Sequence, residues 1–370
     1  MVLKKEMVAD DVLTLARQRV ARLFDEFDRV SVMFSGGKDS TVALNLTLEE
    51  AARRNRPPVD VVFYDEEALP PETIEYVDRV ARDSRLALRW YCLPVQHRNA
   101  CSRKAPYWYP WAPESQPLWC RTLPARAITV LSGFNRQPIP ECNALIYPDR
   151  AERVAVVMGI RASESLRRYR AVAQKVEDNW LSVDPLAPHV TLAKPIYDWL
   201  TPDVWSAPRL FGWDYNKTYD VLSRLGIRPN DQRVCPPYGE EPLRGLWMYA
   251  QGWPDLWRRM LERVPGASTA ARYSRSPLYA FGTVEKPPGL TWEEAITKAL
   301  EQWPAAQGER IARRIVGEMR QHFEKNPGVE IPGSDANAVA GGVTWQHLLT
   351  VAVRGDLKGR RIASAREKRK

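Results

Sequence analysis

The sequence predicts an α/β protein built on a parallel sheet, with an aromatic-rich insertion and a helical C-terminal domain. Two observations support the sheet. The apolar runs at residues 30–34, 59–64 and 153–158 have the length and composition of buried strands. Segments with helical apolar spacing separate the first two runs, and strands that alternate with helices indicate βαβ units. A third observation, helical spacing alone from Trp292 onward, predicts the C-terminal domain.

The first helix is predicted at residues 12–27, where Asp10 or Asp11 can act as the N-cap. A helix after the second strand is predicted at residues 71–86. Ligands of such sheets bind at the carboxyl ends of the strands. Because Asp65 directly follows the second strand, we expect it close to a bound ligand; its alternative role is a helix cap or a solvated acid.

Residues 91–148 interrupt the alternation with many prolines and a cluster of tyrosines and tryptophans. This insertion could be a lid, a platform on which bases stack, or a packed irregular subdomain. Further along, Thr201 can cap a helix in which Pro202 suits the first position. The C-terminal third has a loop at 326–342 and a predicted last helix at 347–353. The expected apolar helix faces are made by Trp292, Ala295, Ile296, Ala299, Leu300 and Trp303, and by Ile311, Ile315, Met319 and Phe323.

At 370 residues the chain is long enough for two domains. We expect a ligand-binding domain at 1–240, including the insertion at 91–148, a helical domain at 241–353 and a basic tail at 354–370. No apolar run approaches the roughly 20 residues that span a bilayer, and the N-terminus lacks the apolar segment of a signal peptide. A cytoplasmic protein without membrane contact is therefore expected.

The net charge of +9 is concentrated in the tail. Residues 354–370 contain eight basic and two acidic side chains, so they contribute +6 and the rest of the chain contributes +3. Such a tail is either a solvated chain end or a contact to DNA or RNA phosphates. Under the second interpretation, it adds non-specific nucleic-acid affinity without forming the active site.

The six residues from Ser35 to Ser40 follow a predicted strand and open a predicted helix. Glycines at this position aim backbone N–H groups and the positive end of the helix dipole at one point, which favours a bound phosphate. Lys38 adds a positive charge that we expect to face solvent. The string is not a Walker A loop, since the first glycine of that pattern would fall at Val32. The candidate phosphate-binding residues are Ser35, Gly36, Gly37, Lys38, Asp39 and Ser40.

A second candidate anion contact follows the strand at 153–158, where Gly159 precedes Arg161. Both this turn and the first loop lie at carboxyl ends of predicted parallel strands, so they should be close together. Arg161 is expected to contact the ligand. The alternative is that Arg161 and Glu164 only pair with each other.

In order and spacing, these motifs resemble the phosphoadenosine-phosphosulfate (PAPS) reductase family of the PP-loop ATP pyrophosphatases. Later fragments resemble its subgroup typified by the immunoglobulin-binding-regulator A protein. The resemblance implies an adenine nucleotide alpha hydrolase-like (Rossmann-like) fold. The matching stretches are 35–40, 159–161 with 164–165, 195–199, 203–205, 93–94, 119–121 with Pro124, 236–239, 245–247, Trp257 with 263–264, and 291–293.

The resemblance also implies a reaction. The loop would hold the β- and γ-phosphates of ATP with Mg²⁺, and an acceptor would attack the α-phosphorus, which gives an adenylylated product and pyrophosphate. Lys38, Ser35 and the glycine amides would neutralise the leaving pyrophosphate. Asp39 would position the metal or the loop, Arg161 would contact the α-phosphate or an anionic substrate, and Glu164 would orient Arg161. Asp65 and Gly159 would line the nucleotide site.

The cysteines and histidines limit this resemblance. Family members that reduce PAPS with thioredoxin use a cysteine in a Glu-Cys-Gly-x-His segment near the C-terminus, whereas this chain has no cysteine after Cys235. We therefore expect no thioredoxin-dependent PAPS reduction. The five cysteines include no Cys-x-x-Cys pair and the four histidines show no zinc spacing, so no metal site is predicted, although cysteines distant in sequence could still gather around an iron–sulfur cluster.

Two further functions stay open at this stage. One is a nucleotide-binding regulator that acts with a partner, for which the resemblance suggests a ParB-like protein. The other is a sulfur-transfer enzyme for nucleic acid, with Cys120 or Cys235 as the sulfur carrier.

Overall fold

The computed structural model divides the chain into two compact units. The first consists of Met1–Asn99 with Tyr107–Ser268, and the second of Ala100–Pro106 with Thr269–Lys370. The sequence-based boundary at 240 thus differs from this division, which lies after Ser268. The tail beyond residue 355, with its predicted nucleic-acid contact, lies outside the described residues. The structure describes residues 8–56, 58–102, 104–165, 168–169, 172, 178–239, 245–273 and 284–355.

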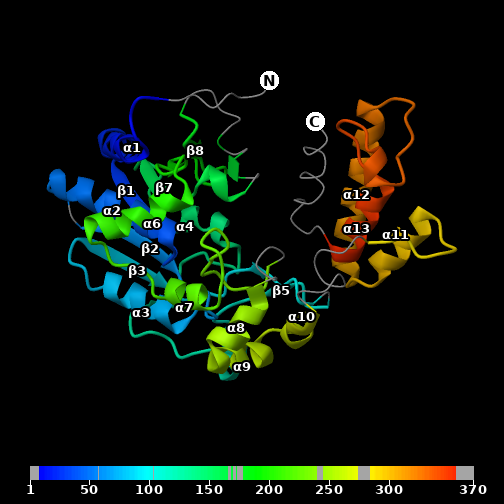
Figure 1. Cartoon of the computed structure of the whole chain (residues 1–370), viewed down its shortest axis with the longest axis horizontal. Helices are drawn as coiled ribbons and strands as arrows, with labels where there is room; N and C mark the ends of the chain where they lie inside the picture. The colour runs from blue at the N-terminus through cyan, green and yellow to red at the C-terminus, as the bar shows by residue number, and fades with distance from the viewer. Residues whose placement is uncertain are drawn as a thin grey trace. The chain divides into compact units, whose positions relative to one another are not determined.

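A seven-stranded sheet of order β6-β3-β2-β1-β7-β9-β8 forms the centre of the first unit (Figure 1). Paired strands are parallel except for β8, which runs antiparallel to β9 at one edge. The chain passes from β1 to β2 and β3 on one side, while β7 and β9 lie on the other side of β1. The strand order therefore reverses between β1 and β7. The strands are β1 (Arg29–Phe34), β2 (Val59–Tyr64), β3 (Leu86–Tyr91), β6 (Ala127–Ile128), β7 (Val154–Met158), β8 (Leu181–Val183) and β9 (Val190–Ala193).

Apolar side chains cover both faces of this sheet. Val32 and Phe34 of β1 belong to a buried cluster with α1, α2, α3 and α6, whereas Val62 of β2 and Val156 of β7 pack with α4 on the other face. A sheet buried on both faces explains the nearly continuous apolar strands. The predicted α/β class with a parallel sheet is confirmed. The helices of this unit are α1 (Val12–Glu26), α2 (Lys38–Arg53), α3 (Pro71–Val80), α4 (Asn143–Ile146), α6 (Thr201–Phe211), α7 (Thr218–Arg224), α8 (Leu246–Gly252) and α9 (Pro254–Arg263).

Four strands of this sheet were absent from the sequence prediction, and one of them replaces part of a predicted helix. The helix expected at 71–86 ends at Val80. The Asp83 carboxylate then accepts the Arg85 N–H at 2.9 Å, which closes a turn that residues of this type favour. β3 begins at Leu86. It contains the charged Arg89 among apolar residues, and this charge concealed the strand pattern in the sequence. The other three missed strands are β6, β8 and β9.

Of the two helix caps predicted for this unit, one is confirmed and the other is wrong. Asp11 is the N-cap of α1 and accepts the Thr14 N–H at 2.8 Å, as expected. Thr201, by contrast, is the first helical residue of α6 rather than its cap. The N-cap is Leu200, whose N–H donates to the Asp203 carboxylate at 2.7 Å. A carboxylate three residues into the helix thus replaces the expected threonine cap.

The insertion at 91–148 is an irregular segment, and all of it except Ala100–Pro106 belongs to the first unit. Trp108 and Trp111 are buried, and Trp111 meets Trp119 edge to face at 5.1 Å between ring centroids. These rings therefore fill the interior, which favours the packed subdomain over an exposed stacking platform. The regular elements of the insertion are β4 (His97–Arg98), β5 (Tyr107–Trp108), the 3₁₀ helices η1 (Pro113–Leu118) and η2 (Ile139–Glu141), β6 and α4.

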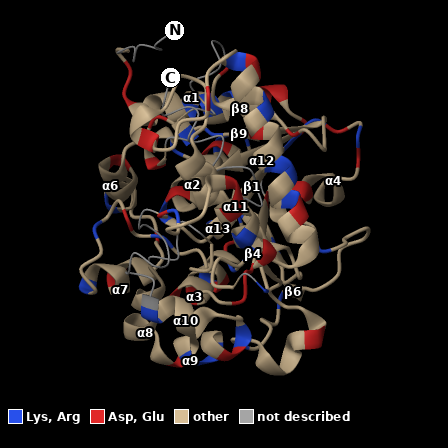
Figure 2. Cartoon of the chain, turned by 90° about the vertical axis from the view of Figure 1, so that its right-hand side faces the viewer, with Lys and Arg blue, Asp and Glu red and all other residues tan. Residues whose placement is uncertain are grey.

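Helices make up the regular structure described in the second unit. Thr291 caps α11 in a reciprocal box with Glu294, the N-terminal signature expected of such a helix. Side chains of both charge signs alternate along α12 (Figure 2). The apolar face predicted to include Phe323 is displaced, because Phe323 is 47% exposed and the buried neighbour is His322, whose Nδ1 accepts the Val343 N–H at 3.2 Å. The helices are α11 (Trp292–Glu301), α12 (Ala305–Lys325), η6 (Asp335–Asn337) and α13 (Trp345–Arg354), with α10 (Ala267–Tyr273) crossing the boundary.

Within the described ranges, every helix is too short or too polar to traverse a bilayer.

Candidate functional site

The loop from Ser35 to Ser40 connects β1 to α2 at the point where the strand order reverses. Gly36 has a φ of +70°, a conformation that glycine adopts without strain. Its N–H has no hydrogen-bond partner among the described residues, although the residue is buried. Gly37 is the N-cap of the 16-residue helix α2. An unsatisfied amide beside a helix N-terminus is a site that favours an anion.

Two serine hydroxyls hold the shape of this loop. The Ser40 hydroxyl donates to the Gly37 carbonyl at 2.9 Å and accepts the Ser35 N–H at 3.2 Å. The Ser35 hydroxyl accepts the Gly37 N–H at 3.3 Å. Ser35 is the one exposed residue of the six, so its hydroxyl can also reach a ligand.

Lys38 is buried, contrary to the solvent-facing position expected from the sequence. Its side chain is 7% exposed, and Nζ lies 3.1 Å from Asp39 Oδ2 and 3.4 Å from the Gln232 carbonyl. Burial lowers the Lys38 pKa below its usual value, although the Asp39 carboxylate acts in the opposite direction. The Arg161 guanidinium pairs with the other oxygen of Asp39. One carboxylate therefore holds both of the cations that the sequence assigned to phosphate.

Gly159 contacts the first turn of α2 directly. A Cβ at this position would lie 2.4 Å from the Ser40 backbone nitrogen and 2.5 Å from the Asp39 carbonyl carbon. Only a residue without a side chain allows β7 to end this close to α2. Gly159 thus brings Arg161 within reach of Asp39, and this packing role explains the glycine without any ligand contact.

Glu164 orients the turn around Arg161 through the backbone. Its carboxylate accepts the Arg161 N–H at 3.3 Å, whereas the Arg161 guanidinium turns to Asp39 and to the Ser163 hydroxyl at 3.0 Å. The alternative of a simple pair between the Arg161 and Glu164 side chains is therefore wrong. Glu164 pairs instead with Arg168 and, at 3.6 Å, with Arg233.

The loop also rests on residues that the sequence did not indicate. The Asn216 side chain donates to the Gly36 carbonyl at 2.9 Å, and the Tyr219 hydroxyl accepts the Lys38 N–H at 2.9 Å. These partners lie about 180 residues away in sequence, so no local pattern could identify them. Arg233 is a further missed residue, and its side chain is 40% exposed.

The charges around the loop leave an excess of positive charge. Four cations face two carboxylates, which gives a local sum of +2. An excess of positive charge at a helix N-terminus favours an anion such as a polyphosphate. The cations are Lys38, Arg161, Arg168 and Arg233, and the carboxylates are Asp39 and Glu164.

Asp65 lies at the carboxyl end of β2, beside β1, as predicted. It is 1% exposed, and protein groups meet both of its oxygens. The Trp90 indole N–H donates to Oδ2 at 2.8 Å, while the Glu67 N–H and the Arg121 guanidinium meet Oδ1. The structure therefore makes Asp65 a support of the strand end, and its contact with a ligand stays a prediction.

Glu67 is the most constrained residue near the site. Its side chain is fully buried and its φ is +59°, which is uncommon for a residue other than glycine. The carboxylate accepts hydrogen bonds from Arg263 Nε at 2.9 Å, from the Trp111 N–H at 2.7 Å and from the Cys120 N–H at 2.9 Å. Glu67 thereby connects β2, the insertion and α9.

The structure distinguishes the two candidate sulfur carriers. Cys120 is buried, and this burial raises the pKa of its thiol. Cys235 is exposed, yet the surrounding protein and the nearby Glu66 carboxylate raise its pKa to about 11. Only Cys235 of the two is accessible, and it is protonated at neutral pH. Across the described ranges, no group of three or more His, Cys, Asp or Glu side chains is arranged to hold a metal ion.

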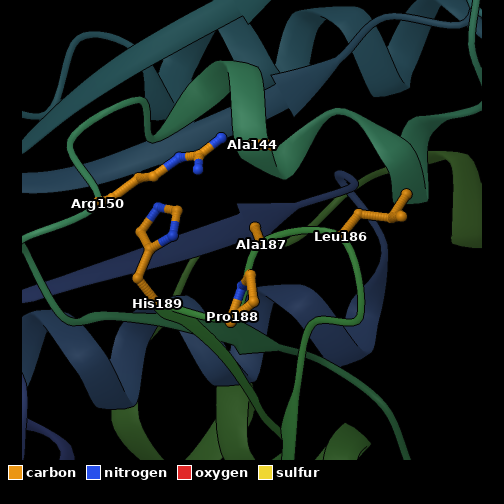
Figure 3. Close-up of a pocket in the computed structure, with 6 residues that line it drawn as sticks. All are labelled: Ala144, Arg150, Leu186, Ala187, Pro188 and His189. Carbon is orange, nitrogen blue, oxygen red and sulfur yellow. The ribbon is translucent and has the colours of Figure 1, made fainter.

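A separate hollow of about 250 Å³ lies near the amino ends of β7 and β9 (Figure 3). Arg150 and His189 border it together with the apolar Leu186 and Pro188. The His189 ring is hydrogen-bonded to the Tyr147 carbonyl at 2.8 Å. This hollow lies at the opposite ends of the strands from the loop, and no residue predicted from the sequence lines it.

The fold and the loop define an α/β protein with a glycine loop and a helix N-terminus at the switch point of a mainly parallel sheet. The chain belongs to the phosphoadenosine phosphosulfate reductase domain family, whose sequence model matches residues 29–229, or 201 of the 370 residues. A second model, "Domain of unknown function (DUF3440)", matches residues 226–333.

One curated relative covers nearly the whole chain. The "Uncharacterized protein YbdN" of Escherichia coli K12 is 29% identical over 365 residues, which are 94% of this chain and 88% of that protein.

Three solved structures show weaker similarity. Candida glabrata FMN adenylyltransferase with FMN and the ATP analogue AMPCPP is 14% identical with a TM-score of 0.37, and the match covers 58% of this chain and 64% of that chain. Candida auris PAPS reductase in a phosphate complex is 15% identical with a TM-score of 0.32, and the match covers 59% of this chain and 93% of that chain. The U34-tRNA thiolase NcsA of Methanococcus maripaludis with its [4Fe-4S] cluster is 12% identical with a TM-score of 0.32, and the match covers 71% of this chain and 79% of that chain. The chain spans less than two thirds of the FMN adenylyltransferase structure. With TM-scores this low, these similarities add nothing to the argument about function.

Proposed function

We propose that this protein binds ATP at the loop from Ser35 to Ser40 and catalyses attack on the α-phosphorus, so that an acceptor is adenylylated and pyrophosphate leaves. The observation that carries the proposal is the unsatisfied Gly36 amide at the N-terminus of α2, surrounded by an excess of positive charge. Membership in the phosphoadenosine phosphosulfate reductase domain family supports a nucleotide as the anion.

The chain's residues would act mainly through electrostatics. The Gly36 and Gly37 amides and the Ser35 hydroxyl would contact the terminal phosphates, and Arg233 would reach them from the exposed side. Lys38 and Arg161 would not be free to contact the phosphates at once, because Asp39 pairs with both. Phosphate negative charge would compete with Asp39 for these two cations. Such preorganised positive charge stabilises the leaving pyrophosphate.

The residues present do not form a protein-only Mg²⁺ site. Both oxygens of Asp39 face cations, and the described residues contain no cluster of three or more metal-ligating side chains. Mg²⁺ commonly binds substrate phosphates with few protein ligands. We therefore propose that Mg²⁺ accompanies the nucleotide, and we assign no step to it.

Replacement of Lys38 by methionine is expected to weaken ATP binding about 10- to 100-fold, since hydrogen bonds to charged groups contribute about 1.5–3 kcal/mol. Calorimetric titration with ATP measures this change. Lys298→Met, at an exposed position of α11, serves as the matched control and should bind like the wild type. Equal ATP affinity in the wild type and Lys38→Met would contradict the proposed site. Incubation with [α-³²P]ATP, with and without DNA, RNA or small acceptors, tests for adenylyl transfer and pyrophosphate release.

The exposed Cys235 keeps nucleic-acid sulfur transfer as a second candidate. Because its pKa is raised to about 11, we expect its alkylation by iodoacetamide to be slow at neutral pH and to accelerate about tenfold per pH unit. This pH-dependent alkylation should disappear in Cys235→Ser but not in Cys120→Ser. Turnover that survives Cys235→Ser would remove the sulfur-carrier role.

Absence of turnover with every acceptor would favour the remaining proposal, a nucleotide-binding regulator of the immunoglobulin-binding-regulator A-like subgroup with a ParB-like partner. DNA or RNA as the acceptor is likewise a proposal, and the charge of the tail supports it.

A further inference from the structure

Glu66 and His97 form a contact pair at the carboxyl end of β2. Glu66 lies between Asp65 and Glu67, whose side chains are fully engaged with the protein. Its own carboxylate Oε2 lies 3.4 Å from His97 Nε2, and the two side chains are 24% and 22% exposed. The Glu66 side chain is therefore partly accessible, unlike the flanking carboxylates, whereas the His97 Nε2 atom behind it is buried.

The pair lies next to the phosphate loop. Phe34 of β1 is paired with Phe63 of β2, so these two parallel strands end side by side. The loop follows β1, and the segment with Glu66 follows β2. The segment that follows Gln232 reaches both places. In this segment, Val234 lies beside Gly37, because a Cβ placed on Gly37 would be 3.4 Å from the Val234 side chain. Tyr238 of the same segment contacts Trp108 edge to face, with 4.9 Å between the ring centroids.

A wall of buried aromatic rings packs behind His97. The His97 ring packs against Trp108 at 5.8 Å between centroids, and Trp108 in turn contacts Tyr238. The Tyr249 hydroxyl donates to the Cys235 carbonyl at 3.2 Å, which fixes the thiol-bearing turn beside this wall. Trp108 and Tyr238 are buried, so these rings support His97 from behind, and Glu66 presents its partly exposed carboxylate beside the loop.

We infer that Glu66, supported by His97, accepts the proton in the reaction and that the acceptor lies beside Glu66 at the carboxyl end of β2. The inference rests on the proposed function. As the acceptor's O–H, N–H or S–H group attacks, its heteroatom forms a bond to the α-phosphorus and its proton passes to the pair. The bond between the α-phosphorus and the α,β-bridging oxygen breaks, and pyrophosphate leaves with that electron pair.

The surroundings of Glu66 suit this role. Burial, followed by the charge of Asp65, raises the Glu66 pKa to about 8. The titratable groups that face it are Asp65, His97 on β4, Cys235 and Tyr249 on α8. A base whose pKa lies near the working pH transfers protons efficiently, and the apparent value belongs to the coupled pair. The strained Glu67 backbone holds Glu66 in place.

Stability measurements test the pair without any acceptor. Between about pH 5 and 8 the folded Glu66 keeps its proton and the unfolded carboxyl loses it, so folding stability falls as the pH rises. Glutamine cannot ionise. The melting temperature of the wild type should therefore fall relative to Glu66→Gln over this range. Glu75→Gln, an exposed control on α3, should follow the wild type. If the melting temperatures of the wild type and Glu66→Gln changed in parallel between about pH 5 and 8, the raised pKa of Glu66 would be wrong, and the inference with it.

Conversion of [α-³²P]ATP to AMP, with water as the acceptor, tests the chemical role. The wild-type rate should rise with pH up to about 8 and then level off. Glu66→Gln should lower the rate about 10²–10⁴-fold and abolish this rise, with calorimetric ATP affinity unchanged. His97→Gln should shift the midpoint of the rise. An unchanged rate and pH profile in Glu66→Gln would overturn this inference alone. Absence of transfer from the α-phosphorus to water and to every acceptor tested, by the ATP-bound wild type, would overturn the proposed function and this inference with it.

Discussion

Glu67→Gln is expected to reduce the free energy of unfolding of the first unit by about 3–5 kcal/mol, because it leaves the buried Arg263 guanidinium without its counter-charge. Glu67 is fully buried and Arg263 nearly so. The Trp111 and Cys120 amides would also lose an ionised acceptor. Urea denaturation followed by tryptophan fluorescence measures the change.

Two further variants test the stated cause. Glu75→Gln removes an exposed carboxylate from α3 and should change stability by less than about 0.5 kcal/mol. Glu67→Gln combined with Arg263→Met removes the uncompensated charge and should be more stable than Glu67→Gln alone. A Glu67→Gln protein as stable as the wild type would show that the pair does not hold the insertion and α9 to β2.

Gly159→Ala is expected to reduce ATP affinity at least about tenfold and to destabilise the protein by about 1–3 kcal/mol. The added Cβ would lie 2.4–2.6 Å from backbone atoms of Ser40 and Asp39, so the first turn of α2 must move. That turn carries the phosphate loop and the carboxylate that holds Lys38 and Arg161. Calorimetry with ATP and thermal unfolding measure the two effects.

Gly317→Ala provides a control of opposite sign. This glycine lies within α12, where an added Cβ meets nothing within 4 Å, so alanine should stabilise the helix by about 0.5–1 kcal/mol. If Gly159→Ala behaved like Gly317→Ala, then close packing of β7 on α2 would not be the reason for glycine at position 159.

Local patterns sufficed for the elements whose interactions are local. The strand at 59–64, the helix with Asp11 as its cap and the glycine turn after β1 all follow from neighbouring residues. The errors occurred where distant residues decide. β3 was taken as the end of a helix because its pairing with β2, not its periodicity, makes it a strand. Phe323 was expected inside, but the packing of the second unit buries His322 instead.

The sequence by itself determined the α/β class, the position of the phosphate loop and the closeness of residues 35–40 to 159–161, because strand–helix alternation and glycine backbone geometry are properties of short segments. Only the tertiary structure decided which groups face a ligand. It buried Lys38 and Asp65, joined Asp39 to Arg161, and brought Glu66, His97 and the segment from Gln232 to Tyr238 together. The physical reason is that burial and charge pairing depend on segments as far as 196 residues apart in sequence, and no local spacing encodes such contacts.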